Sequence, residues 1–129
     1  MGAKVGGVTL QVAAVAVAPA GSVLVPAGVV MKANDVDEVV LTYNVKLDET
    51  ALEDLDLEVV DSNVLIGGSA INAGLVNINI VKASPTVNST NVLVTVTVTL
   101  DQPLTKAVYD VIKNQDITFD LTFTGSIAN

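Results

Sequence analysis

NVLVTVTVTLD, residues 91–101, alternates aliphatic residues with threonine along almost its whole length. Val92, Val94, Val96 and Val98 fall on one side of an extended chain, and the threonines fall on the other. Both residue types are β-branched, which restricts χ1 in a helix and suits a pleated surface. No charge, glycine or proline interrupts the run before its final aspartate. The segment therefore predicts a central β-strand with one buried and one wet face.

The same alternation predicts further strands on both sides of this segment, separated by residues that favour turns. They are expected at residues 8–17, 22–25, 39–47, 56–60, 63–67, 73–82 and 117–124, with a single helical turn at 50–54. Pro19–Gly21, the polar stretch 32–38 and residues 84–90 are expected to be turns or loops, and Gly68 a breaker.

One helix is expected near residues 103–113. Its apolar residues recur at the i, i+3, i+4, i+7 spacing that gives one hydrophobic face. They are Leu104, Ala107, Val108, Val111 and Ile112. Asp101 is the expected N-cap, Pro103 suits the first turn, and Asn114 suits a left-handed terminator.

Seven or eight short strands with one helix predict an all-β fold, an antiparallel β-sandwich of jelly-roll or Ig-like type. The 129 residues are expected to form a single domain, 1–129, in which residues 1–18 are a candidate for strand exchange. The helix is expected to cross from one sheet to the other and to cap an open end of the core.

The composition excludes several kinds of chemistry. The chain has no histidine, cysteine or tryptophan, and its six basic residues are all lysine. An imidazole base, a thiolate zinc site and a guanidinium clamp on phosphate are therefore absent. The net charge of −8 repels nucleic acid. The expectation is a protein that is not an enzyme, has no catalytic residues and does not bind nucleic acid.

Residues 8–30 are apolar almost throughout and approach the length that a bilayer requires. Pro19, Gly21 and Pro26 divide the stretch into pieces of about ten residues or fewer, which disfavours a spanning helix. No membrane span is therefore expected. The stretch also lacks the basic n-region of a signal peptide, so an export signal is expected only if it was removed before Met1.

Acidic residues gather in two parts of the chain. Residues 48–61 hold seven of the 14 acidic side chains, and Asp35, Asp37 and Glu38 lie further upstream. If these loops share one end of the sandwich, their carboxylates are candidate calcium ligands. The residues proposed for this site are Asp35, Asp37, Asp54 and Asp56. No EF-hand spacing is present, and a solvated edge that keeps neighbouring sheets apart is the favoured interpretation.

The apolar N-terminal stretch is the main hint of an adhesive role. It is uncharged and β-prone, and it either forms an edge strand of its own domain or adds to the sheet of a neighbour. The intramolecular arrangement is the default. The candidate self-association residues are Val8, Leu10, Val12, Val15 and Val17. Val40 and Leu93 add apolar surface on the wet faces of their strands.

Two parts of the chain resemble secreted fibre-forming proteins of the TasA/camelysin type. They are Leu24–Val45, which ends in VVLTYNV, and Asn91–Thr124, which contains VTVTVTLD, a short helix and ITFDLTFTG. The resemblance implies an exported jelly-roll-like sandwich that polymerises by N-terminal strand donation. The usual Pro-Gly-Asp turn is Ala33-Asn34-Asp35 here, and no functional residue carries over.

These observations predict a non-enzymatic structural protein, secreted or at the cell surface, whose partner is itself. It would assemble into filaments by β-strand addition, with residues 8–17 as the donor and an edge strand as the acceptor. The alternative is a virion or cell-surface β-sandwich that binds a carbohydrate or protein through its loops. A calcium-stabilised adhesion domain is a third hypothesis, and calcium is the one cofactor considered.

Overall fold

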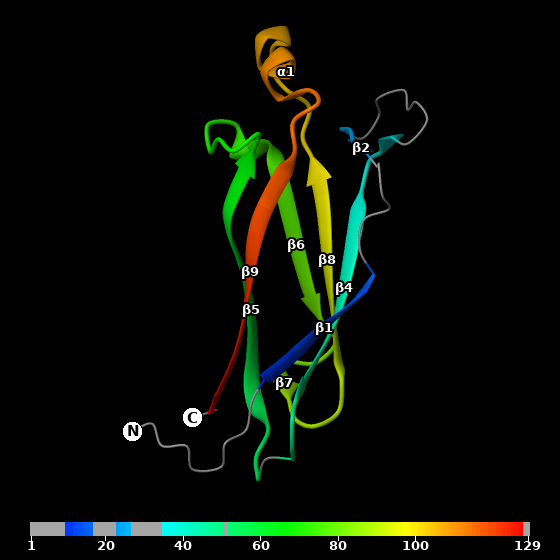
Figure 1. Cartoon of the computed structure of the whole chain (residues 1–129), viewed down its shortest axis with the longest axis vertical. Coiled ribbons are helices and arrows are strands. Elements are labelled where there is room, and N and C mark those ends of the chain that lie inside the picture. The colour runs from blue at the N-terminus through cyan, green and yellow to red at the C-terminus, as the bar shows by residue number, and fades with distance from the viewer. Residues whose placement is uncertain (1–9, 17–22, 27–34, 51, 128–129) are drawn as a thin grey trace.

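The computed structural model describes residues 10–16, 23–26, 35–50 and 52–127. Its elements are, in order, β1 (Leu10–Ala16), β2 (Val23–Leu24), β3 (Asp35–Val36), β4 (Val39–Leu47), β5 (Leu55–Ile66), a 3-10 turn (Ala73–Leu75), β6 (Val76–Lys82), β7 (Thr86–Val87), β8 (Val92–Leu100), α1 (Lys106–Ile112) and β9 (Ile117–Ile127). The predicted all-β fold with antiparallel sheets and one short helix is confirmed (Figure 1).

Two antiparallel sheets make up the body of the molecule. The first has the order β1-β4-β8-β6, and the second has the order β7-β5-β9. β8 lies inside the first sheet, where Val96 is opposite Leu41 of β4 and Ile80 of β6. β2 and β3 form a separate parallel pair. The alternating segment therefore occupies the central position that its composition predicts.

The valine side of β8 faces the second sheet. Val94 and Val96 are completely buried, whereas Leu93 on the other side is exposed. The core contains Val45, Leu47, Val92, Val94, Val96 and Val98 from the first sheet, with Leu57 and Val87 from the second. Tyr43 and Phe123 meet edge to face across it, with ring centroids 5.5 Å apart. Aliphatic side chains thus fill the space between the sheets, with little aromatic contribution.

The two ends of the sandwich are defined by strand direction. Val39, at the start of β4, is opposite Val98 near the end of β8, so both lie at the end that carries α1. Leu47 and Leu55 lie at the other end, where residues 48–54 connect β4 to β5. We call these the α1 end and the β4–β5 end. They are the opposite ends of the long axis in Figure 1.

β5 corrects the prediction of two short strands at 56–60 and 63–67. It is one strand of 12 residues that pairs with β9 along almost its whole length. The register shifts between Ser62 and Leu65, and Asn63 has a positive φ of 55°. An extra residue inserted at a β-bulge breaks the two-residue period without ending the strand. The helical turn expected at 50–54 does not form in residues 52–54.

Other boundaries differ by a few residues. The strand expected at 73–82 begins with a 3-10 turn, β3 lies inside the expected loop 32–38, and β7 lies inside the expected turn 84–90. β9 runs three residues beyond its expected end. Val8, Val17 and the turn expected at 19–21 lie outside the described residues.

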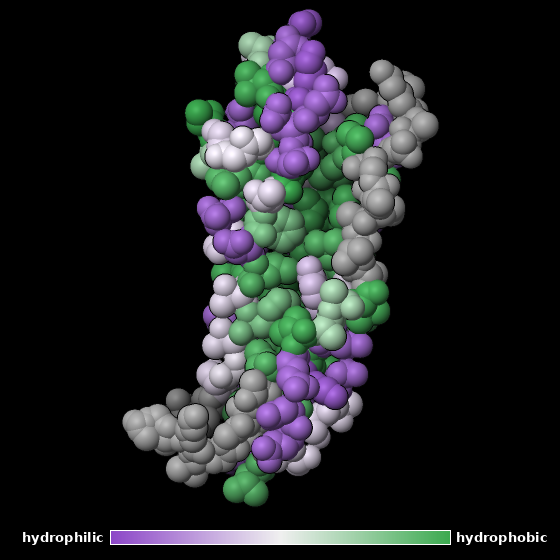
Figure 2. Space-filling model, in the orientation of Figure 1, coloured by the Kyte–Doolittle hydropathy of each residue, from purple (hydrophilic) through white to green (hydrophobic). Residues whose placement is uncertain are grey.

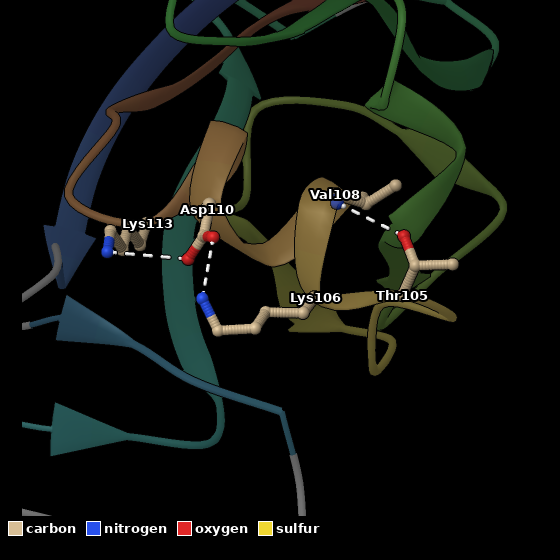
Figure 3. A network of polar contacts seen from close by, with 5 residues as sticks. All are labelled: Thr105, Lys106, Val108, Asp110 and Lys113. Atoms are coloured by element: carbon tan, nitrogen blue, oxygen red, sulfur yellow. Dashed lines mark hydrogen bonds and ion pairs between the residues drawn. The ribbon is translucent and has the colours of Figure 1, made fainter.

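The helix is shorter than expected, and its cap is a different residue. Thr105 is the N-cap, and its hydroxyl accepts a hydrogen bond from the Val108 amide (Figure 3). Asp101, the expected cap, instead accepts a hydrogen bond from the Asn77 side chain at 2.8 Å, and its own amide donates to the Leu75 carbonyl. Asn114 has a φ of 62°, which confirms the expected left-handed terminator.

Candidate strand-addition surface

An apolar groove opens between β4 and β9 at the α1 end. β1 pairs with β4 only from Thr42 to Leu47, so none of the described strands pairs with Val39–Leu41 on that side. The groove has a volume of about 620 Å³. Its lining residues are Val23, Leu24, Val39, Leu41, Val98, Asn114, Gln115, Asp116, Ile117, Thr118 and Phe119. Figure 2 shows hydrophobic side chains reaching the surface along the middle of this face.

β9 forms one wall of the groove and is an edge strand of 11 residues. Within the described part of the chain it pairs with β5 alone. Its inward side chains, such as Phe119 and Phe123, pack on the core, while Thr122 and Thr124 are exposed. Soluble proteins commonly protect such edges with lysine, proline or a covering loop. β9 has neither lysine nor proline, and Asp120 is its only charged residue.

β1 is weakly anchored in the first sheet. It pairs with β4 in antiparallel register, with a shift between Ala14 and Ala16. Leu10 packs against the core, but every residue from Gln11 to Val15 is exposed. Backbone pairing rather than side-chain burial therefore holds most of this strand in place.

The structure separates the predicted self-association residues into three kinds. Leu10 is part of the packing around the core. Val12 and Val15 present apolar side chains to solvent, 41% and 57% exposed. Val8 and Val17 lie outside the described residues. In this single chain β1 completes its own sheet, which is the default arrangement that the sequence favoured.

The acidic residues proposed as calcium ligands lie at opposite ends of the sandwich. Asp35 and Asp37 precede β4 at the α1 end, and Asp54 and Asp56 follow it at the β4–β5 end. A nine-residue strand at about 3.3 Å per residue keeps the two pairs roughly 25–30 Å apart. Asp54 instead accepts a hydrogen bond from Asn88 at 2.8 Å. No group of three or more metal-ligating side chains occurs among the residues that the structure describes.

The groove itself was not predicted from the sequence. Leu41, Val98 and Phe119 come from three strands whose residues are far apart in the chain. The alternation in their strands places all three on the inward side, where residues normally contact the facing sheet. Leu41 and Phe119 are only partly buried. Their exposure depends on which strands lie next to theirs, and the sequence of a single strand does not specify its neighbours.

The chain matches no family model, and neither the curated proteins nor the solved structures include a significant match to it. The resemblance to TasA/camelysin-type proteins therefore stays a prediction. None of the helices in the described part of the chain has the length and hydropathy needed to cross a bilayer.

Proposed function

We propose that this protein is a non-enzymatic structural subunit, exported or displayed at a cell surface, that assembles with copies of itself by β-strand addition. One observation supports the proposal above the others: β9 is a long edge strand with little protective charge, and it lies beside an apolar groove. Such an edge offers main-chain hydrogen bonds for affinity, and the groove offers sites for alternate side chains.

The donor in this proposal is the N-terminal strand. β1 has few side chains packed on its own domain, so releasing it exposes little additional apolar surface. An incoming strand that pairs with β9 would place every second residue over Leu41, Val98 and Phe119 in the groove. Because donor and acceptor are different surfaces, the contact is head-to-tail, and it extends into a filament when the rotation does not close.

The side-chain chemistry agrees with a structural role. A chain without histidine, cysteine or arginine lacks the groups most often used as general bases, soft metal ligands and phosphate clamps. Its most distinctive feature is the alternation of valine with threonine along β8. That composition suits backbone pairing and packing between sheets.

Deletion of residues 1–18 tests the donor. The truncated protein should remain folded and monomeric by size-exclusion chromatography, while the full chain forms filaments visible by electron microscopy. Filaments that persist after the deletion would contradict donation by this strand. A full chain that gives only discrete species at every concentration would instead favour a binding module that recognises other molecules through its loops.

A pair of lysine variants tests the acceptor without removing any residue. Thr122 on β9 and Val60 on β5 are cross-strand partners, and both are exposed. Thr122→Lys adds a charge beside the free edge and should slow filament growth strongly. Val60→Lys places the same charge on the neighbouring strand, one strand away from the unpaired edge of β9, and should have a much smaller effect. Equal growth rates for the two variants would exclude β9 as the acceptor.

A further inference from the structure

The groove beside β9 is one end of a longer gap between β4 and β9. At the α1 end the gap is open and forms the groove, because β1 does not extend to residues 39–41 of β4. At the β4–β5 end β1 lies in the gap, and Figure 1 shows it running from beside the end of β9 to the side of β4. The protein thus fills one end of this gap with its own N-terminal strand and leaves the other end open.

Leu10 of β1 occupies the gap at a position where β9 has no side chain. Gly125 is opposite Leu57, whose side chain is buried between the sheets, so Gly125 also faces inward. A Cβ on Gly125 would lie 3.9 Å from Cδ1 of Leu10 and 3.4 Å from Cδ1 of Leu55. A glycine inside a strand often marks such a close approach. The missing side chain at this point of β9 leaves the room that Leu10 occupies.

β1 in this position limits how much of β9 another copy can use. The groove reaches only residues 117–119 of β9, whereas the strand continues to Ile127. A strand paired with three residues forms few backbone hydrogen bonds, too few to offset the freedom lost on association. A strand paired along the whole of β9 would place a side chain at Gly125, where Leu10 already lies. Full pairing with β9 therefore requires β1 to leave.

The contacts that hold β1 in the gap are few. Residues 11–15 are all exposed, and the pairing with β4 shifts register between Ala14 and Ala16. Among the described side chains of β1, only Leu10 packs against the core. Segments with few buried apolar contacts open locally at a lower free energy than the unfolding of the whole domain. β1 can therefore leave its sheet while the rest of the sandwich stays folded.

We propose that β1 inhibits assembly in the isolated chain by covering the part of β9 that an incoming strand needs. Release of β1 then has two effects in one step, because it frees the donor strand and opens the acceptor edge of the same copy. A copy that keeps β1 in place acts neither as donor nor as acceptor. The inference rests on the proposed strand addition and adds the regulation of that site.

A disulfide between β1 and β4 tests whether β1 must be released. Ala13 and Asn44 are direct cross-strand partners, and the native chain has no cysteine. Partners in an antiparallel pair have Cα atoms about 4.5–5.5 Å apart, within the range of roughly 4.4–6.8 Å that a disulfide needs. Oxidised Ala13→Cys/Asn44→Cys should form filaments at least about tenfold more slowly than the native chain, and a thiol reductant should restore growth.

Thr42→Cys/Thr95→Cys is the matched control. These residues are also direct partners, on β4 and β8, so their disulfide joins two strands that stay paired during assembly. The oxidised control should grow within about twofold of the native chain. Equal slowing of both oxidised variants would overturn the proposal, since the effect would not depend on β1. Normal growth of the oxidised Ala13→Cys/Asn44→Cys variant would overturn it together with donation by β1.

Mixing experiments test the acceptor. Oxidised Ala13→Cys/Asn44→Cys cannot donate its strand, and if β1 also covers β9 it cannot accept one. Its addition to the native chain should therefore leave filament growth unchanged. Val12→Lys is the comparison: Val12 is 41% exposed, so the variant should fold and release β1, but a lysine disfavours entry into an apolar groove. This variant accepts a strand without donating one, so substoichiometric amounts should cap filament ends and slow growth.

The outcomes separate inhibition by β1 from strand addition itself. If the oxidised Ala13→Cys/Asn44→Cys variant slowed growth of the native chain as much as Val12→Lys does, its acceptor would be open. That result would overturn the inhibition and leave strand addition standing. A native chain that forms no filaments under any condition would instead contradict the proposed function.

Discussion

Gly67 and Gly68 show how single residues shape the α1 end. Both have positive φ, 60° and 79°, in the turn that leads out of β5. The Gly67 amide also donates to the Asp116 carbonyl at 2.8 Å, which joins this turn to the start of β9. The sequence identified Gly68 as a break between strands and placed Gly67 at the end of the strand expected at 63–67. It did not indicate that the first glycine also lies against the Gln115 side chain.

Alanine substitutions at three glycines should separate backbone strain from crowding. In Gly68→Ala the new Cβ has no atom within 4 Å, so the substitution should lower the free energy of unfolding by about 1–2 kcal/mol, the penalty of the left-handed region. At Gly67 a Cβ would lie 2.6 Å from Oε1 of Gln115, so Gly67→Ala should cost more than Gly68→Ala. Gly74→Ala has open space and no positive φ, and should change stability by less than about 0.5 kcal/mol.

Urea denaturation of the three variants measures these differences. If Gly74→Ala destabilised the protein as much as Gly67→Ala, the loss of stability could not be explained by the positive φ of Gly67 or by crowding against Gln115. If Gly67→Ala cost no more than Gly68→Ala, the flexible Gln115 side chain would have moved aside, and strain alone would explain both.

At the scale of elements, β4 and β8 were predicted nearly residue for residue because their alternation is unbroken and one face is buried. β5 was predicted as two strands, since its bulge at Asn63 interrupts the period in the sequence. Only its pairing with the long β9 reveals one continuous strand. The cap of α1 was missed for a similar reason: Asp101 has the right chemistry but is held by Asn77 and Leu75, contacts that depend on β6.

The ion pairs on α1 lead to a prediction about its titration. The hydrogen bond from Lys106 is the main cause of the lowered pKa of the Asp110 carboxyl, and Lys113 adds to it. A carboxyl whose pKa is lowered by folding contributes stability above its ordinary pKa, and this contribution is lost as the pH falls through the lowered value. The ion pairs of α1 should therefore break only at acidic pH, at a lower pH than the one at which an ordinary aspartate takes up its proton.

Lysine-to-methionine variants check this assignment by NMR titration of the Asp110 carboxyl. Lys106→Met should raise its pKa further than Lys113→Met, because the Lys106 contact is shorter and hydrogen-bonded. Lys46→Met, on β4, should leave it unchanged. A pKa of Asp110 that responds equally to all three substitutions would point to the net charge of the protein and not to the contacts drawn in Figure 3.

At the scale of the whole molecule, the arrangement of strands decides what each surface does. The groove and the separation of the two acidic regions both follow from sheet order and strand direction, which no local pattern encodes. The sequence placed the two acidic stretches before and after the strand at 39–47, but it could not say which end of the sandwich each occupies. The exposed edges of β1 and β9 likewise follow from their positions in the two sheets.

Assembly must also overcome repulsion, since every copy carries a net charge of −8. Added salt shortens the range of that repulsion, from a Debye length of about 30 Å at 0.01 M to about 8 Å at 0.15 M. Backbone pairing along β9 and burial in the apolar groove are far less sensitive to salt. Filament growth followed by light scattering should therefore be faster at 0.15 M than at 0.01 M sodium chloride.

The variant Asp56→Asn/Glu58→Gln supplies the control. Both residues are exposed on β5, away from the groove, and their neutralisation changes the net charge from −8 to −8 + 2 = −6. This variant should grow faster than the native chain at 0.01 M salt and respond less to added salt, because less repulsion remains to be screened. Growth that slows as salt is added would show that attraction between unlike charges, and not repulsion between copies, limits assembly. Backbone pairing along β9 would then not be the step that controls the rate.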